Sequence, residues 1–325
     1  ENLRLLRAAV RPQTEIIFVV KANAYGHGAI PVARGAWEAG VTWFAVVHMD
    51  EAVALREALP DAQIILLGAI APSDVKEAAG SRLLPMLVDR DHAQSLAAAP
   101  GRGRKPLVCH AKIDTGMGRL GFDWQEAGGI LPGLERSGFS IQGIGSHLAS
   151  ADECGRAYAA IQYERFRQVV DTCAANGLQI PFKHLSNSGG IQLNRNWDLD
   201  GVRSGILLYG YGKDPARSGP GAPPHRRDET REIATRPFLH WKTRVVQVKR
   251  VPAGFRVSYD STFVADRETC IGTINAGYSD GYSRQLSHKG IVLINGRRRR
   301  VAGRVTMNFT AVDLGPEGDV KPGDE

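Results

Sequence analysis

The chain has 325 residues, of which 43% are hydrophobic and 23% are charged, and its formal net charge is +7. This length and composition can bury one large core and a smaller second one, which excludes a disordered or fibrous chain. No apolar run approaches the roughly 18 residues that a membrane-spanning helix requires, so we expect a soluble protein.

The cysteines and the first residues bear on location and metal binding. The four cysteines show neither CxxC spacing nor a paired framework, which is typical of reduced cytosolic thiols rather than of disulfides or a zinc site. The sequence begins at Glu1 without the basic and apolar segments of a secretory signal. We therefore expect a cytoplasmic protein that ligates no metal.

From residue 16 to 210, short β-rich runs alternate with stretches whose apolar residues recur every three or four positions, such as "DEAVALREAL". Eight alternations in about 200 residues favour a parallel (β/α)8 barrel of the TIM type over an open sheet. The strand candidates are "IIFVVKA", "TWFAVV", "QIILLG", "LLPMLV", "PLVCHAKID", "IQGIGSHLA", "FKHLSNS" and "VRSGILLYG".

A segment rich in proline, glycine and charge, residues 213–236, follows the last of these strands and reads as a linker. Beyond it, "FLHWKTRVVQVKRV", "CIGTINAGYS", "GIVLING" and "VAGRVTMNFTAVDLG" lack intervening helices, which predicts a smaller, mostly β domain. We place the barrel at residues 1–225 and the β domain at residues 226–325.

The positive net charge could indicate nucleic-acid binding, with the run from Arg297 to Arg300 as the candidate patch. That run follows Asn295 and Gly296, a dipeptide typical of β-hairpin turns, and lies between apolar runs. A solvated hairpin is therefore the preferred interpretation, and the nucleic-acid hypothesis rests on charge alone.

Lys21 ends the apolar run of the first strand candidate, in "FVVKANAYGHG". In a (β/α)8 barrel, functional groups project from the carboxyl ends of the strands, where Lys21 would lie. A desolvated amine there is nucleophilic, and an imine with a carbonyl cofactor is a common use of such a lysine. The alternative is a lysine that merely extends from the strand end to water.

The last two strand candidates lead into "SNSGG" and "RSGILLYG", at positions where such barrels commonly bind a phosphate. Ser188 offers a hydroxyl, and the backbone N–H groups of Gly205 and Ile206 can approach phosphate oxygens because Gly205 has no side chain. Two turns that only close the barrel are the alternative. A phosphate site together with an imine-forming lysine points to pyridoxal phosphate.

The stretch "AKIDTGMGRLGF" contains a GxGxxG pattern, at Gly116, Gly118 and Gly121, which could indicate a dinucleotide site. The next strand candidate carries no acidic residue at its end to bind a ribose, and Arg119 occupies the interior of the loop. Arg119 is better suited to holding a substrate carboxylate through its planar guanidinium.

Eight motifs, in order, resemble alanine racemase, a pyridoxal-phosphate enzyme family of bacterial cell-wall precursor synthesis. They cover nearly the whole chain, and their number and spacing make the resemblance specific. The motifs are "VVKANAYGHG", "KIDTGMGRLGF", "SHLASAD", "NSGG", "VRSGILLYGYG", "VSYDSTF", "GYSDGYSR" and "GRVTMNFTAVDL".

The resemblance implies catalytic roles for four residues. Lys21 would carry the cofactor and act as the base facing the D-enantiomer. Tyr259, supplied across a homodimer interface, would be the base facing the L-enantiomer. Arg203 would face the pyridine nitrogen, and His147 would lie against Tyr259 and Arg203.

The resemblance also implies binding roles, which the matching positions carry over one by one. The phosphate would be held by Tyr25, Ser188, Gly205 and Ile206. The substrate carboxylate would be received by Arg119 and the backbone of Met307. Lys112 is a candidate for carbamylation, and the entrance to the site would be lined by Asp152, Tyr278, Arg284 and Arg304.

Two positions depart from the family pattern, which usually has Gly at Asp260 and Asp at Asn308. Both lie beside the implied site, so they bear on substrate range and pH optimum. The family also continues for several strands beyond "KPGDE", which implies that the β domain is incomplete here.

Three other enzyme or binding classes stay open. The chain could be a racemase with a broader range of small amino acids, such as serine. It could be a non-catalytic pyridoxal-phosphate barrel, which would not need a β domain bearing Tyr259. It could also be a barrel decarboxylase, which would place a catalytic cysteine in the β domain, where Cys270 is poorly positioned.

Overall fold

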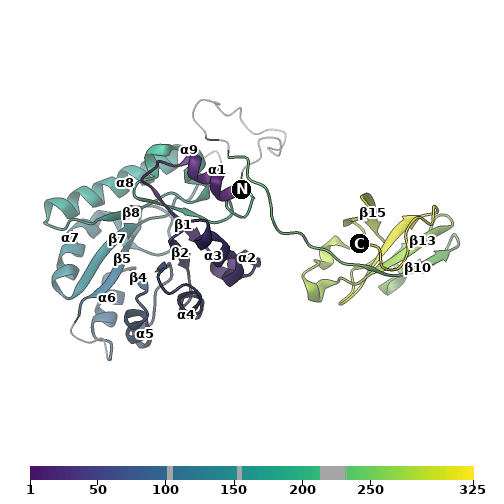
Figure 1. Cartoon of the computed structure of the whole chain (residues 1–325), viewed down its shortest axis with the longest axis horizontal. Helices are drawn as coiled ribbons and strands as arrows, with labels where there is room; N and C mark the ends of the chain where they lie inside the picture. The colour runs from purple at the N-terminus through teal and green to yellow at the C-terminus, as the bar shows by residue number, and fades with distance from the viewer. Residues whose placement is uncertain (101–104, 152–155, 213–230, 232) are drawn as a thin grey trace. The chain divides into compact units, whose positions relative to one another are not determined.

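The computed structural model describes residues 1–100, 105–151, 156–212, 231 and 233–325 (Figure 1). The chain divides into two compact units, Glu1–Leu239 and His240–Glu325. The domain boundary expected between residues 225 and 226 lies outside the described residues. None of the described helices is both long and apolar enough to cross a lipid bilayer.

Eight parallel strands close into a barrel in the first unit, which confirms the predicted (β/α)8 fold. Each strand pairs with its neighbour in order, and β9 pairs with β1 to complete the ring. The short β6 (Phe122–Asp123) pairs in parallel with the carboxyl end of β5. The barrel strands are β1 (Glu15–Val19), β2 (Trp43–Val46), β3 (Gln63–Leu66), β4 (Leu84–Leu87), β5 (Leu107–Asp114), β7 (Phe139–Gly145), β8 (Phe182–His184) and β9 (Gly201–Ser204).

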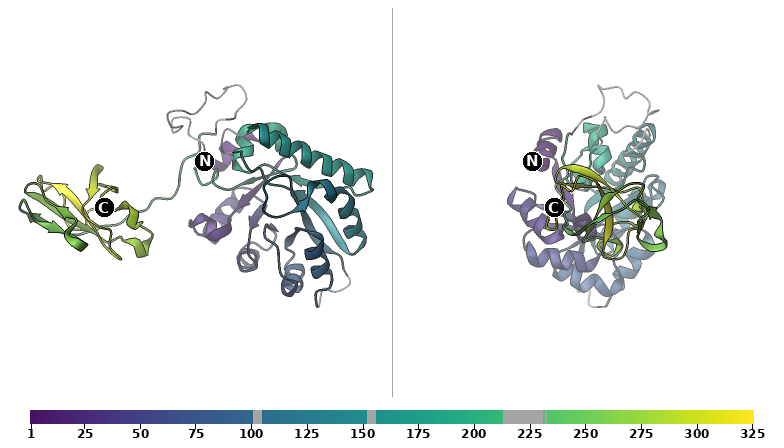
Figure 2. Two further views of the ribbon diagram at one scale, coloured as in Figure 1. Left: turned by 180° about the vertical axis from the view of Figure 1, so that it is seen from behind. Right: turned by 90° about the vertical axis from the view of Figure 1, so that its right-hand side faces the viewer.

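Helices surround this barrel on its outer side (Figure 2). The helices described in this unit are α1 (Asn2–Ala9), α2 (Lys21–Tyr25), α3 (Ala29–Glu38), α4 (Met49–Ala58), α5 (Val75–Gly80), α6 (Arg90–Ala97), α7 (Trp124–Arg136), α8 (Arg156–Ala175) and α9 (Ser188–Leu193), of which α2 and α9 contribute residues to the cavity described below.

The continuous apolar sequence of β1 follows from burial on both faces of the strand. Ile16 and Phe18 belong to the core cluster that packs under the helices. Ile17 and Val19 belong to a separate cluster inside the barrel. Because successive side chains of a strand point to opposite faces, a strand covered on both sides needs apolar residues at every position.

The second unit is an antiparallel sheet of the order β10-β13-β16-β15-β14, beside a two-stranded ribbon, β11 and β12. Its strands are β10 (Val245–Val251), β11 (Arg256–Val257), β12 (Phe263–Val264), β13 (Thr269–Ile274), β14 (Ile291–Ile294), β15 (Arg297–Val301) and β16 (Thr310–Gly315). This confirms the predicted all-β domain.

The basic run lies in β15, one half of the predicted hairpin. Asn295 and Gly296 form the turn with φ values of 49° and 75°, and β14 and β15 pair on either side of it. Arg297 and Arg299 both donate to the carboxylate of Asp319, at 2.9 and 2.7 Å. The hairpin interpretation is confirmed, and two of the four positive charges are paired within the same domain.

Candidate active site

A cavity of about 400 Å³ opens at the carboxyl ends of the barrel strands. Most of the residues that the sequence assigned to the cofactor and the substrate carboxylate line this one cavity. These are Lys21, Tyr25, Lys112, Arg119, His147, Ser188, Arg203, Gly205 and Ile206.

Lys21 begins a left-handed turn directly after β1. The four residues from Ala22 to Tyr25 have φ values between 51° and 55°, a conformation that costs roughly 1–2 kcal/mol per non-glycine residue. The turn is held by the Ala24 N–H, which donates to the Val20 carbonyl, and by the Ala29 N–H, which donates to Asn23 Oδ1, each at 2.8 Å. A strained backbone at a cavity is typical of a functional site.

Glu51 ties this turn to the end of β2. One carboxylate oxygen accepts the Ala22 N–H at 2.5 Å, and the other accepts the N–H groups of Val47 and His48 at 3.0 and 3.1 Å. Glu51 therefore fixes the backbone directly after Lys21. Glu51 was not predicted from the sequence, where its only signal is an acidic side chain in the first turn of α4.

Ser188, Gly205 and Tyr25 form one end of the cavity. The Ser188 hydroxyl accepts the N–H groups of Gly205 and Leu207 at 3.1 and 3.3 Å. A Cβ atom at Gly205 would lie only 2.7 Å from the Tyr25 hydroxyl oxygen. Burial raises the pKa of Tyr25, which keeps its phenol protonated as a hydrogen-bond donor. Two hydroxyls and a glycine backbone thus form a polar cradle of the kind that binds phosphate.

Arg203 is the most fully bonded cation of the cavity wall. Its Nη1 donates to the Nδ1 and the carbonyl of His184 at 2.8 and 2.9 Å. Its Nη2 donates to the carbonyls of Ser146 and Leu185. Burial, together with the nearby Arg119, lowers the pKa of Arg203 to about 10, so it stays charged. The hydrogen bonds described for Arg203 are all made by Nη1 and Nη2, and the side chain lines the cavity.

His147 lies between Arg203 and Asn187. Its Nδ1 is 3.3 Å from Arg203 Nη2, and its Nε2 is 3.3 Å from Asn187 Nδ2. Burial and the surrounding cations, Arg203 foremost, lower the pKa of His147 to about 2, so the imidazole is neutral. His147 thus contacts Arg203 through its Nδ1.

Lys112 and Arg119 are two further basic residues that line the cavity. Burial, followed by the charges of Arg203 and Arg119, lowers the pKa of Lys112 well below its ordinary value. The Asp114 carboxylate accepts the N–H groups of Gly116, Met117 and Gly118 at 2.9 to 3.1 Å. The GxGxxG pattern therefore forms a turn around Asp114 that leads to Arg119, rather than the opening of a nucleotide-binding helix.

In the second unit, Tyr259 lies in the turn between β11 and β12 and is 69% exposed. The turn is held to Arg304 by an ion pair from Asp260 at 2.6 Å and by a hydrogen bond from the Ser258 hydroxyl at 2.8 Å. Asp260 has a φ of 59°, in the left-handed region that favours glycine and that aspartate also tolerates.

Hydrogen bonds join the loop at Met307 to the turn that begins at Tyr278. The Met307 carbonyl accepts hydrogen bonds from the Ser279 N–H and hydroxyl, and Asn308 Nδ2 donates to that hydroxyl at 3.0 Å. Tyr278 donates its N–H to the Thr306 carbonyl at 3.0 Å. Arg284 begins a short 3₁₀ turn, and Asp152 lies outside the described residues.

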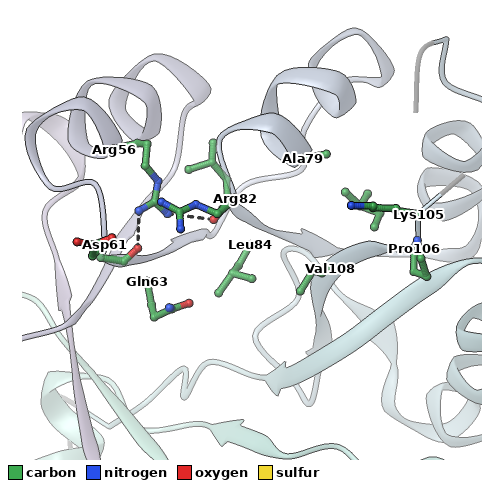
Figure 3. Close-up of a pocket in the computed structure, with 12 residues that line it drawn as sticks. Arg56, Asp61, Gln63, Ala79, Arg82, Leu84, Lys105, Pro106 and Val108 are labelled. Atoms are coloured by element: carbon green, nitrogen blue, oxygen red, sulfur yellow. Dashed lines mark hydrogen bonds between the residues drawn. The ribbon is translucent and has the colours of Figure 1, made fainter. Parts of the chain in front are cut away.

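A second cavity, of about 380 Å³, lies at the amino ends of β3 to β5 and is shown in Figure 3. Arg56, which lines this cavity, is hydrogen-bonded to backbone carbonyls. The guanidinium donates to the carbonyls of Leu59, Pro60, Ala62, Ser81 and Arg82. Contacts that hold loops at the amino face of a barrel contribute to stability, whereas active sites lie at the carboxyl face.

Replacing Arg56 with methionine should therefore lower the free energy of unfolding by about 2–4 kcal/mol, because several carbonyls lose their donor at once. Arg82→Met is the matched control, since Arg82 Nη2 makes a single hydrogen bond, to Pro60, and should cost less than about 1 kcal/mol. Urea unfolding of both variants measures the difference. Equal losses would contradict the assignment.

Three buried neutral histidines give the barrel a pH-dependent stability. Burial lowers the pKa of His110 to about 3 and that of His184 well below its ordinary value, as for His147. The unfolded chain takes up these protons below a pH of about 6.5, whereas the folded chain does not, so stability falls as the pH falls. Each histidine contributes a slope of up to about 1.4 kcal/mol per pH unit.

Unfolding free energies at pH 7 and pH 5 test this expectation, with His110→Asn as the variant that should lower the slope by one histidine. Equal stability of the unmodified chain at both pH values would show that the imidazoles are not held neutral.

Known proteins resemble this chain over its whole length. The alanine racemase N-terminal domain model matches residues 1–213, and the C-terminal domain model matches residues 238–325. An alanine racemase of Carboxydothermus hydrogenoformans is 41% identical over 325 residues, which cover 100% of this chain and 85% of that protein.

Two solved structures are similar at the level of the fold and the sequence. Alanine racemase from Bacillus anthracis with bound L-Ala-P has a TM-score of 0.87 and 30% identity, covering 99% of this chain and 81% of that one. Alanine racemase from Bartonella henselae with covalently bound pyridoxal phosphate has a TM-score of 0.82 and 30% identity, covering 99% and 84%. The chain belongs to the alanine racemase family, whose members are isomerases.

Proposed function

We propose that this chain interconverts L- and D-alanine with pyridoxal phosphate as its cofactor and supplies D-alanine for peptidoglycan in the cytoplasm. The observation that carries the proposal is the convergence of Lys21, the Ser188–Gly205 cradle and Arg203 on one cavity. An amine, a phosphate cradle and a fixed cation are the three contacts that such a cofactor needs. The covalently bound cofactor of the Bartonella henselae relative supports the same assignment.

When bound, pyridoxal phosphate supplies an aldehyde for attachment to an amine and a ring that withdraws electrons from the substrate Cα. Tyr25, Ser188 and the N–H groups of Gly205 and Ile206 would hold its phosphate. Arg203 would donate through Nε toward the ring nitrogen. Because a guanidinium does not give up its proton, Arg203 would keep that nitrogen unprotonated and limit side reactions.

Racemisation requires that a proton leave one face of Cα and that another arrive on the opposite face. Lys21 would hold and move the proton on the face of the D-enantiomer, and the partner subunit's Tyr259 would do so on the face of the L-enantiomer. A homodimer follows from this division of labour. The exposure of Tyr259 in its own chain is compatible with such an arrangement.

Arg119 and the Met307 backbone would receive the substrate carboxylate, and Tyr278, Arg284, Arg304 and Asp152 would line the entrance. Lys112 is proposed as a carbamylated lysine: burial and two nearby guanidiniums lower the pKa of its amine, and an amine that has lost its proton can add CO2, release a proton to solvent and carry a compensating negative charge. Intact-protein mass measurement under CO2-saturated, non-denaturing conditions should show one added CO2 that Lys112→Ala lacks.

Alanine enantiomers assayed by chiral chromatography test the proposal on the full-length protein, with and without added pyridoxal phosphate. We expect L-alanine and D-alanine to approach equal amounts from either direction only when the cofactor is present. Faster turnover of serine would favour the broader racemase, and release of CO2 would favour the decarboxylase. Cofactor binding without turnover would favour the non-catalytic barrel and contradict the proposal.

A further inference from the structure

Two histidines lie inside the barrel beneath Arg203, and the proposed mechanism uses neither. His184 comes from β8 and His110 from β5, and both side chains are fully buried. His184 Nδ1 is 2.8 Å from Arg203 Nη1, and His184 Nε2 is 3.1 Å from His110 Nδ1. The three side chains therefore form a continuous chain of contacts from the cavity wall into the barrel interior.

The direction of each hydrogen bond in this chain follows from Arg203. A guanidinium can only donate, so His184 Nδ1 must accept and the His184 proton must lie on Nε2. That N–H then donates to His110 Nδ1, which places the His110 proton on its own Nε2. His110 Nε2 has no partner among the described residues. The chain thus has one set of tautomers, and the unpaired donor falls at the end farthest from Arg203.

Both imidazoles are held neutral, which the chain requires. Burial lowers the pKa of His110 to about 3 and that of His184 well below its ordinary value, with the Arg203 charge as the next cause for His184. A protonated His184 would have no lone pair for Arg203. The neutral form therefore keeps His184 Nδ1 as the acceptor of the hydrogen bond from Arg203 Nη1.

The barrel makes room for the pair and keeps water away from it. A Cβ at Gly143 would lie 2.5 Å from the His110 ring, and one at Gly145 would contact the His184 ring. On the other side, Trp43 and Phe182 stack with centroids 4.3 Å apart, and the Phe182 centroid is 5.9 Å from that of His110.

We propose that His110 is a positioning residue for Arg203: by accepting the Nε2–H of His184, it fixes the imidazole that orients the guanidinium at the cavity wall. This rests on the proposed function, in which Arg203 Nε faces the cofactor ring. Loss of the His110 acceptor would leave a buried N–H unpaired, and His184 would relax away from Arg203.

Asparagine and leucine at position 110 form a matched pair, because they have nearly the same shape and only asparagine can accept a hydrogen bond near the position of Nδ1. We expect His110→Leu to raise the apparent dissociation constant of pyridoxal phosphate roughly tenfold, the effect of about one buried hydrogen bond. It should also increase pyruvate formed by side transamination. His110→Asn should stay within about threefold of the unmodified chain in both readouts.

Trp43→Phe is the packing control, since it alters the aromatic wall without touching the hydrogen bonds, and should also stay within about threefold. All variants are compared at a temperature where urea unfolding shows them to be folded. Equal effects of leucine and asparagine, or of leucine and the Trp43 control, would overturn the positioning role.

A second readout needs neither cofactor nor turnover. Two-bond ¹H–¹⁵N correlation spectra of the full chain, labelled at histidine, report which ring nitrogen carries each proton. We expect His184 and His110 both to be protonated on Nε2. A His110 protonated on Nδ1 would refute the inference even if the enzyme binds its cofactor, whereas failure of cofactor binding with the expected tautomers would count against the proposed function alone.

Discussion

Lys21→Ala should reduce racemisation of alanine by about four orders of magnitude or more, because one change removes both the covalent attachment point and a proton-transfer group. The variant should still fold, since Lys21 lies at the cavity and its backbone is held by the neighbouring turn through Glu51 and Val20. Conversion is measured by chiral chromatography from either enantiomer.

Lys76→Ala is the matched control, because it removes an exposed lysine on α5, outside the cavity. It should keep full activity. Methylamine should partly restore the Lys21→Ala variant if the missing group is an amine that moves protons. A Lys21→Ala chain that turns over within tenfold of the unmodified one would refute the role of Lys21.

Tyr259→Phe should lower the rate in both directions by about three orders of magnitude, since each direction needs a proton on each face of Cα. Exchange of the Cα hydrogen with solvent should nevertheless differ between the two enantiomers, because each enantiomer loses its proton to a different residue. In D2O, D-alanine should still exchange its Cα hydrogen through Lys21, whereas L-alanine should not. Mass spectrometry of the recovered alanine measures this exchange.

Tyr163→Phe removes a phenol from α8 and serves as the control; it should behave as the unmodified chain. If Tyr259→Phe exchanged both enantiomers equally, the two-base assignment would be wrong, and a single group would have to serve both faces.

The barrel could be predicted from sequence because its signals are local. Each strand is a short apolar run, and each outer helix repeats its apolar residues every three or four positions. The last strands nevertheless end earlier than expected, at His184 and Ser204. Beyond those residues the chain leaves the sheet and forms α9 and the loop that begins at Gly205. The Ser188 hydroxyl and the Gly205 N–H at the cavity come from these two segments.

The left-handed turn after Lys21 could not be predicted from sequence. Asn23 is the only residue between Ala22 and Tyr25 whose type favours that conformation. The turn is imposed by distant partners such as Glu51, which come together only when β1 and β2 pair. Strain of this kind is paid for by tertiary contacts, and local sequence does not record it.

The role of His110 was hidden for the same reason. In "LVCHAKID" it resembles an ordinary core histidine. Its proposed role depends on three strands, which bring Arg203, His184 and His110 into contact in that order. Likewise, the left-handed φ of Asp260 and its pairing with Arg304 became visible only in the folded second unit.

Reduction of the full-length protein with borohydride, followed by peptide mapping, tests the covalent role of Lys21 most directly. A lysine-bound cofactor should absorb at about 420 nm, lose that band on reduction, and leave its mass on the chain. We predict that the mass will be found on the peptide that contains Lys21 and on no other. Absence of the band in cofactor-saturated protein, or a label fixed to a different lysine, would contradict the account.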